Sequence, residues 1–215
     1  MRRAIGLKAA VLGIAAAVGC TSATRTAVFV PGPEGARARA RADSATLPYT
    51  AADIRFMSTM ISHHAQAIRM AGWAPSHGAN PAVQRLSARI INAQNDEIAL
   101  MGRWLADRSQ PVPEANPAGM KMSMGGAEHM MLMPGMLTDV QMKELDAARG
   151  PGFDVTFLRY MIQHHRGAVT MVKELLANRG AAQDITVFKF AGDVEVDQTT
   201  EINRMLEMLL VAGPP

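Results

Sequence analysis

FMSTMISHHAQAIRM, residues 56–70, occurs a second time in this chain as FLRYMIQHHRGAVTM, residues 157–171. Both copies carry Phe, Met-Ile, His-His, Ala and Met at the same offsets. On a helix, where residues on one face recur every three or four positions, these offsets form one stripe in each copy. The stripes consist of Phe56, Met60, His63, Ala67 and Met70, and of Phe157, Met161, His164, Ala168 and Met171. The pattern predicts two helices that pack on other helices and carry a histidine at the centre of the packing face.

The histidines of these stretches, His63, His64, His164 and His165, raise the question of function. A single histidine on an apolar helix face is usually a core residue with a hydrogen-bond partner. Four are harder to bury, because each imidazole without a partner costs about 1–3 kcal/mol and a small domain has only about 5–15 kcal/mol of net stability. Imidazole nitrogen together with the thioether of Met60, one turn away, is a metal-ligand set. Metal binding is the favoured interpretation, and a buried hydrogen-bond network is the alternative.

Start and stop signals divide the sequence into four long helices. The first His-His helix ends near Gly72, and Asn80-Pro81 begins a second helix that runs to about Asp107. Asn178-Arg-Gly180 ends the second His-His helix, and one more apolar helix follows it. Each half of the chain is therefore expected to form a helical hairpin.

The second hairpin repeats the first. Gln94-Asn-Asp-Glu-Ile98 in the second helix corresponds to Gln198-Thr-Thr-Glu-Ile202 in the fourth. Two hairpins with one apolar face each bury those faces against each other, which predicts an all-α four-helix bundle. We expect this domain to occupy residues 49–215, with its halves at about 49–110 and 138–211.

Asp53 and Asp154 each stand three residues before the phenylalanine of a stripe. A carboxylate near the start of a helix can accept hydrogen bonds from the free backbone N–H groups there. We therefore expect both aspartates to cap helices rather than to bind a ligand.

Methionines crowd the connector between the two halves, residues 111–137. Seven of the 17 methionines of the chain occur there, at positions 120, 122, 124, 130, 131, 133 and 136. Glycine and proline interrupt the connector, so it has no helical periodicity, and flexible thioethers favour Cu(I) over Zn(II), Mg(II) or Ca(II). We predict that Met120, Met122 and Met124 add capacity for Cu(I); the alternative is a loop that folds back as apolar packing. Thr138-Asp-Val-Gln141 then resembles a capping box that opens a short helix.

The first 19 residues are interpreted as an export signal. Met1-Arg-Arg and Lys8 are basic, and the apolar run at 9–18 is too short to span a membrane as a helix. Ala17-Val-Gly-Cys20 resembles the bacterial lipobox, which implies that Cys20 is lipidated and becomes the mature N-terminus. An ordinary signal peptide cleaved nearby is the alternative. Since Cys20 is the only cysteine, no intramolecular disulfide is expected.

Residues 20–48 are predicted to form a flexible tether. Their composition shifts to Ala, Arg, Gly, Pro and Thr, and Pro31, Pro33 and Pro48 interrupt any continuous helix. The net charge of +3 includes the three basic residues of the signal, so the basic balance gives no evidence for a nucleic-acid partner.

The doubled Asp, Phe, Met-Ile, His-His, Ala, Met pattern resembles the bacterial domain of unknown function 305 family. Gln and Glu-Ile on each following helix and Met-Pro-Gly-Met at 133–136 add to the resemblance, which covers nearly everything after the tether. It implies a ferritin-like bundle in an exported protein connected with periplasmic copper handling. By position, the motif residues are Asp53, Met60, His63, His64, Met70, Asp154, Met161, His164, His165 and Met171.

Three function classes follow from the sequence. The first is an exported protein that binds or sequesters Cu(I) or Ag(I); the second is a ferritin-like oxidoreductase; the third is a metal-free envelope interaction lipoprotein with structural histidines.

The oxidoreductase class lacks its usual motif. Di-iron bundles use Glu-x-x-His motifs, but Leu100 and Arg204 stand three residues after Glu97 and Glu201. These glutamates could still accept a hydrogen bond from a histidine and orient it. No serine or cysteine is set up as the nucleophile of a triad, so we do not expect a hydrolase.

The favoured mechanism is binding without turnover. Each His-His helix offers one imidazole into the seam of the bundle and a second toward its flank, and Met60 or Met161 completes a site with nitrogen and sulfur ligands. We expect a location in the bacterial cell envelope, anchored through Cys20 and facing the periplasm or the exterior. The expected partners are the membrane and other envelope copper proteins. One shared site or two separate sites, and the oligomeric state, stay open.

Overall fold

A computed structural model describes residues 30–46, 48–124 and 127–212. The predicted signal at 1–19 and Cys20 lie outside these ranges. In chain order the elements are α1 (Gly32–Thr46), α2 (Ala51–Gly72), α3 (Pro81–Asp107), β1 (Met120–Met124), β2 (Ala127–Met131), α4 (Asp139–Ala147), α5 (Gly150–Ala177) and α6 (Ile185–Ala212). Within the described ranges, no helix combines the length and the apolar character needed to cross a membrane.

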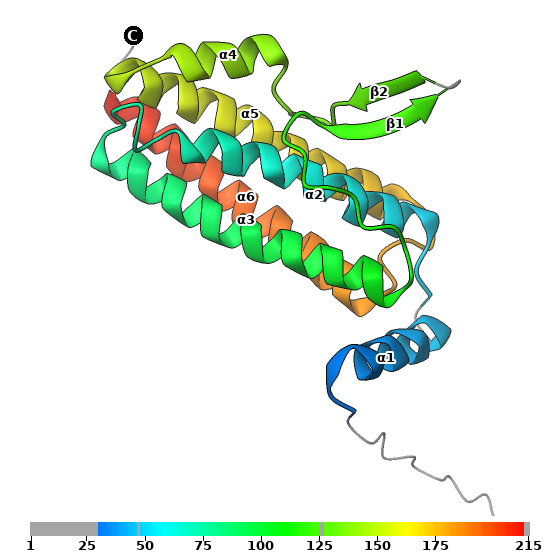
Figure 1. Ribbon diagram of the computed structural model, residues 1–215. Helices are drawn as coiled ribbons and strands as arrows, with labels where there is room; N and C mark the ends of the chain where they lie inside the picture. Colours follow the sequence, from blue (N-terminus) through cyan, green and yellow to red (C-terminus); the bar gives the residue numbers. More distant parts are fainter. Residues whose placement is uncertain (1–29, 47, 125–126, 213–215) are drawn as a thin grey trace, which may run out of the picture.

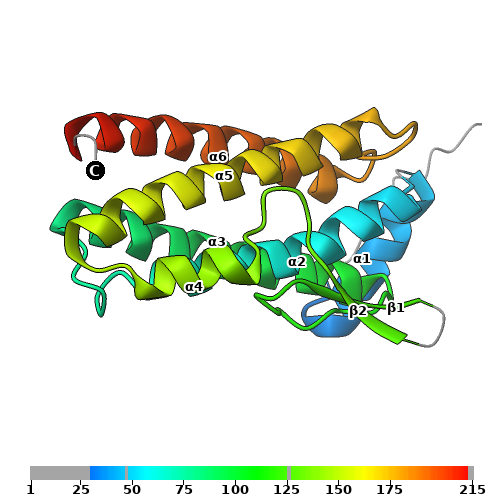
Figure 2. The ribbon, with the colours of Figure 1, turned by 90° about the horizontal axis from the view of Figure 1, so that it is seen from above.

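The four long helices α2, α3, α5 and α6 form a bundle, as the duplicated hairpins predict (Figure 1). α2 packs on α3, α5 packs on α6, and the hairpins meet mainly through α2 and α5. Seen from above, α5 and α6 lie on one side of the molecule and α2 and α3 on the other (Figure 2). The two His-His helices are therefore the central pair, and the stretch that is repeated in the sequence meets its own copy.

Two clusters of apolar side chains fill the bundle on either side of the histidines. Phe56 and Met60 from the first half of α2 pack in one cluster with Met171 from the second half of α5. Met70 from the end of α2 packs in the other cluster with Met161 from the first half of α5. The shared clusters show that α2 and α5 run antiparallel. They also place the histidines between two layers that contain methionine.

Side-chain caps define the helix starts that the sequence predicts. Thr50 and Asp53 form a capping box at the start of α2, and Thr138 and Gln141 form another at the start of α4. Asn80 caps α3 by accepting hydrogen bonds from the backbone N–H groups of the first turn. These interactions satisfy N–H groups that have no partner within the helix.

The two aspartates of the repeated motif also join the hairpins to each other. Asp53 Oδ1 accepts a hydrogen bond of 2.7 Å from the backbone N–H of Ala182, in the loop before α6. Asp154 accepts hydrogen bonds from the backbone N–H and the side-chain amide of Asn80, at 2.8–3.3 Å. The capping prediction is confirmed for Asp53 and wrong for Asp154. Because α5 already begins at Gly150, the Asp154 carboxylate instead binds the start of α3 in the other hairpin.

The structure differs from the predicted tether over part of residues 20–48, where α1 is helical. Pro33 lies in the first turn of α1, where its missing N–H group has no helical partner to lose, and Pro48 follows the helix. Alanine and arginine between them are strong helix formers. In Figure 1, α1 lies at one end of the bundle, where it contacts α3, and no α1 side chain belongs to either of the core clusters formed by the described residues.

The connector 111–137 contains a β-hairpin that the sequence analysis does not predict. β1 and β2 pair antiparallel, in a register that places Met122 opposite His129. Gly125-Gly126 is a sequence signal for a two-residue hairpin turn, although these two glycines lie outside the described residues. The connector is therefore partly ordered as a ribbon beside the bundle rather than wholly irregular (Figure 1).

Candidate metal centre

The four histidines form one buried layer in the middle of the bundle. His63 and His64 come from α2, His164 and His165 come from α5, and each has an exposed fraction of 0%. The rings of His63 and His164 face each other across the α2–α5 contact, with centroids 3.9 Å apart and planes inclined by 40°. Each outer ring lies 6.3 Å from the ring of its inner neighbour. As expected, each helix offers one imidazole to the seam and one to the flank.

Glutamates of the partner helices hold the outer histidines. His165 Nε2 forms a hydrogen bond of 2.7 Å with Glu201 Oε2. His64 Nε2 lies at the same distance from Glu97 Oε2, although the angles of this second contact are not those of a hydrogen bond. Metal-binding histidines commonly donate their second ring N–H to a carboxylate, which fixes the tautomer and orients the ring.

The Nδ1 atoms of all four histidines are buried without a hydrogen-bond partner. His63 Nε2 lies 3.0 Å from the carbonyl oxygen of Pro134, and a carbonyl only accepts, so Nε2 carries the proton and Nδ1 keeps a free lone pair. His164 has no partner at either ring nitrogen. A buried polar atom without a partner costs about 1–3 kcal/mol of stability, so this layer destabilises the folded state unless a bound group uses the lone pairs.

The connector makes the two halves of the site unequal. Gln66 of α2 anchors it by exchanging two hydrogen bonds with the backbone of Leu137, at 2.6 and 3.0 Å. At the matching position of α5 stands Gly167, where an added Cβ would come within 1.9 Å of the Pro134 carbonyl oxygen. The glycine lets the Met133-Pro-Gly-Met136 turn lie directly on α5, and the same carbonyl then reaches His63.

Burial sets the charge state of the inner pair. Burial lowers the pKa of His63 to about 3, the nearby charge of His64 acts in the same direction, and the hydrogen bond to Pro134 opposes both. Burial and the charge of His63 hold the pKa of His164 well below its ordinary value of 6.5. Both imidazoles are neutral at pH 7, which is the state that binds a metal.

Thioethers stand above and below the histidine layer. Met60 is fully buried in the same cluster as Met171, Met133 and Met136, of which the last two come from the connector. Met70 and Met161 occupy the cluster on the other side of the layer. The four helix methionines that the sequence predicts are therefore buried in the two apolar clusters, two in each. The structure adds Met133 and Met136, which the prediction leaves out.

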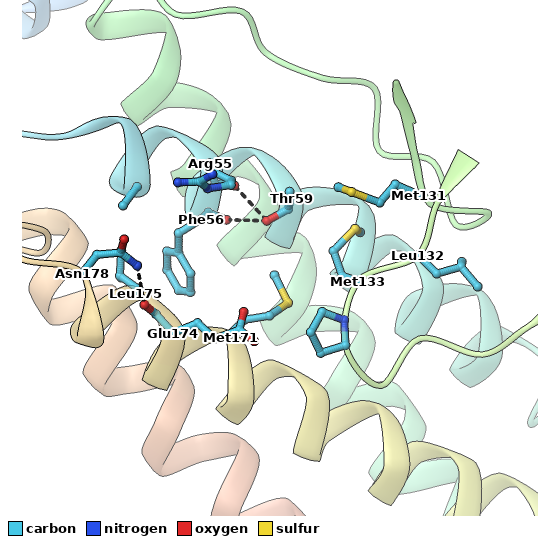
Figure 3. A pocket seen from close by; sticks show the side chains of 12 residues that line it. Arg55, Phe56, Thr59, Met131, Leu132, Met133, Met171, Glu174, Leu175 and Asn178 are labelled. Carbon is cyan, nitrogen blue, oxygen red and sulfur yellow. Dashed lines mark hydrogen bonds between the residues drawn. The ribbon is translucent and has the colours of Figure 1, made fainter. Parts of the chain in front are cut away.

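A pocket of about 430 Å³ lies between α2, α5 and the connector, and its lining includes Pro134, whose carbonyl oxygen lies next to His63. Met131, Met133 and Met171 line it with their thioethers, and Thr59 and Phe56 form the α2 wall (Figure 3). Met171 and Met133 are only 6% and 5% exposed, whereas Met131 is 36% exposed. The side chains at the mouth and at the base of the pocket thus offer the same soft ligand atom.

A second cleft, of about 510 Å³, separates α3 from α6 and reaches Glu97 and Glu201. Buried Gln94 and Gln198 line it, and their side-chain carbonyl oxygens have no partner. Burial, and then the charge of Glu97, raises the pKa of Asp197 in the same cleft. The cleft connects the carboxylates that lie next to the outer histidines with solvent.

The remaining predicted ligands lie apart from the histidine layer. Met120 packs against the cluster that contains Met60 and Met171, and Met122 of the hairpin is 37% exposed. Met124 lies in β1, and its side chain is outside the described part of the structure. Among the described residues, no group of three or more His, Cys, Asp or Glu side chains is arranged to hold a metal ion. The soft-metal hypothesis rests on imidazole together with thioether.

The DUF305 family, a domain of unknown function, matches residues 53–209 of this chain. A comparison with curated proteins gives no significant match. Among solved structures, a candidate secreted DUF305 protein from Streptomyces coelicolor is 30% identical over 75% of this chain and 94% of its own, with a TM-score of 0.62. A DUF305 fragment from Deinococcus radiodurans is 25% identical over 74% of this chain and 96% of its own, with a TM-score of 0.60.

CopM is also similar to this chain. Its Cu(I)-bound form is 28% identical over 73% of this chain and 94% of its own, with a TM-score of 0.54. CopM has also been solved with Cu(II) and with Ag. The family match covers the whole bundle, from Asp53 in the first turn of α2 to Leu209 near the end of α6. This chain therefore belongs to the DUF305 family.

Proposed function

We propose that this protein is an exported copper-binding protein that holds Cu(I), or Ag(I), in the core of its helical bundle without turnover. The observation that carries the proposal is the layer of four buried histidines, in which every Nδ1 atom lacks a partner. Methionines lie on both sides of this layer. The solved copper and silver forms of CopM support the same class of ligand.

The chemistry of the donors favours a monovalent soft ion over Zn(II). Imidazole and thioether are neutral ligands, so the charge of the metal stays in the buried layer, and a divalent ion leaves twice as much charge to compensate there. Zn(II) sites are usually built from Cys, His and carboxylate, whereas thioether is a useful ligand mainly for Cu(I). The sole cysteine, Cys20, lies outside the described residues, and its expected role is the lipid anchor.

Thermal unfolding with added metal tests the proposal. A ligand that binds only the folded state stabilises it by about 2.7 kcal/mol at a hundred times its Kd. Under anaerobic, reducing conditions the wild-type protein should gain this stabilisation from Cu(I) and clearly less from Zn(II). The His63→Ala/His164→Ala variant should lose most of the gain from Cu(I), because it removes the two facing imidazoles.

His77→Ala is the matched control. His77, in the loop between α2 and α3, is also buried, but its Nε2 atom lies 3.0 Å from the carboxylate of Asp146 in α4. This variant should melt earlier without metal and keep the full gain from Cu(I). If Zn(II) stabilises the protein more than Cu(I), or if the double variant gains as much as the wild type, the copper site is not at these helices. The buried hydrogen-bond network would then be the better account of the histidines.

A further inference from the structure

The β-hairpin gathers soft ligands on one of its two faces. Its register pairs Met120 with Met131 and Met122 with His129. Residues directly opposite each other in an antiparallel pair share a face, with Cβ atoms about 4.5–5.5 Å apart, and so do residues two positions along a strand. Met120, Met122, His129 and Met131 therefore lie on the same face. The neighbouring pair, Lys121 and Met130, lies on the other face.

The face that carries these ligands continues into the bundle. Met120 packs against the cluster that contains Met60, Met133 and Met171. Met131 lines the pocket whose inner wall includes Met133 and Met171 (Figure 3). Met130, on the other face, is 44% exposed and does not line this pocket.

Burial increases step by step along this series of thioethers. The exposed fraction is 37% at Met122 and 36% at Met131, falls to 5–6% at Met133 and Met171, and is 0% at Met60, one turn from His63. His129, paired with Met122, is exposed. The exposed fraction of the thioethers thus falls from the hairpin, through the pocket, to the buried face of α2.

We propose that His129 and Met122 form an entry site for Cu(I) and that Met131, Met133 and Met171 pass the ion to the histidine layer. This inference rests on the proposed function, because it assumes that the layer binds the ion. The transfer is ligand exchange: a new copper–sulfur bond forms as an earlier copper–ligand bond breaks, and copper remains Cu(I) throughout. No electron or covalent group moves, and the neutral thioethers leave the charge of the ion unchanged at each step.

The entry site makes a kinetic prediction that the central site does not make. The full chain is mixed in a stopped-flow instrument with Cu(I) supplied as its coloured bicinchoninate complex, and loss of the complex is followed by absorbance. The Met122→Leu/His129→Ala variant should take up copper about tenfold more slowly than the wild type, the change expected when about 1.4 kcal/mol of ligand binding is lost at entry. After equilibration, its gain in thermal stability from Cu(I) should equal that of the wild type.

Lys121→Ala/Met130→Leu is the matched control, since it changes one residue on each strand of the same hairpin but on the opposite face. It should take up copper at the wild-type rate. Equal uptake rates for the entry-site variant and the wild type, in a protein that Cu(I) does stabilise, would overturn the entry site and leave the proposed function intact. Absence of any stabilisation of the wild type by Cu(I) would instead overturn the proposed function.

Slow uptake by both hairpin variants would also overturn the inference, because it would show that the shape of the hairpin matters rather than its ligand atoms.

Met131→Leu provides a further check within the series of thioethers. It keeps the volume of the side chain but removes the thioether at the mouth of the pocket. This variant should also slow uptake while leaving the final gain in stability unchanged.

Discussion

Two neutral imidazoles that face each other in an apolar core make the protein sensitive to acid. Burial keeps the pKa of His63 at about 3 and the pKa of His164 well below 6.5. In the unfolded chain both residues titrate near the ordinary value of 6.5. As the pH falls from about 6.5 toward 3, the unfolded chain therefore binds protons that the folded chain does not, and the free energy of unfolding falls.

The expected loss between pH 7 and pH 5 is about 2 kcal/mol for His63, and the lowered pKa of His164 adds a loss of the same sign. Urea unfolding at the two pH values measures it, and the His63→Gln/His164→Gln variant should show a much smaller change. Bound Cu(I) should reduce the loss for the wild type, because a metal-bound nitrogen cannot take up a proton. A wild-type free energy of unfolding that is the same at pH 7 and pH 5 would contradict these lowered pKa values.

At the scale of elements, the carboxylates of Asp53 and Asp154 connect each His-His helix to the loop of the other hairpin. Asp154 is 5% exposed and accepts both hydrogen-bonding groups of Asn80. Asp154→Ala should lower the free energy of unfolding by about 1–3 kcal/mol, because it leaves the backbone N–H of Asn80 without its partner. Denaturant unfolding measures the change.

Asp96→Ala is the control for this prediction, since Asp96 is an exposed aspartate on α3. It should change the free energy of unfolding by less than about 0.5 kcal/mol, as is usual for surface substitutions. If the two variants lose the same stability, the contact between Asp154 and Asn80 does not hold the hairpins together.

The hairpin β1–β2 is the element that sequence patterns describe least well. Methionine has no strong preference for strands, and the paired segments lack the β-branched residues that usually mark a strand. The dipeptide Gly125-Gly126 is the signal that could have revealed the turn. The ligand-bearing face with Met122 and His129 follows from strand pairing, so it was not visible in the linear order of the methionines.

For the whole molecule, we propose that export ends in a lipid anchor at Cys20, which lies outside the described residues. The basic start, the short apolar run and Gly19-Cys20 motivate the proposal. In cells, Cys20→Ala should move the protein from the membrane fraction to the soluble fraction of the envelope. Fractionation followed by immunodetection measures the shift. A variant that stays with the membrane would show that the attachment lies elsewhere in the chain.

The sequence by itself determined the helices, their ends and their duplication. Periodicity and capping are local: the stripe from Phe56 to Met70, the cap at Asn80 and the box at Thr138 depend only on residues within a few positions. That is why the bundle and the set of four histidines could be predicted without coordinates. Helix α1 is the exception, because the prolines near its ends predict an interrupted chain while the alanines and arginines between them favour a helix.

The tertiary structure decided which histidine meets which partner. His63 faces His164, while His64 and His165 turn to Glu97 and Glu201, because the rotation and the vertical register of antiparallel helices depend on packing over the whole bundle. The same packing brings the connector across α5 at Gly167. These contacts join residues far apart in the chain, and helical periodicity carries no information about them.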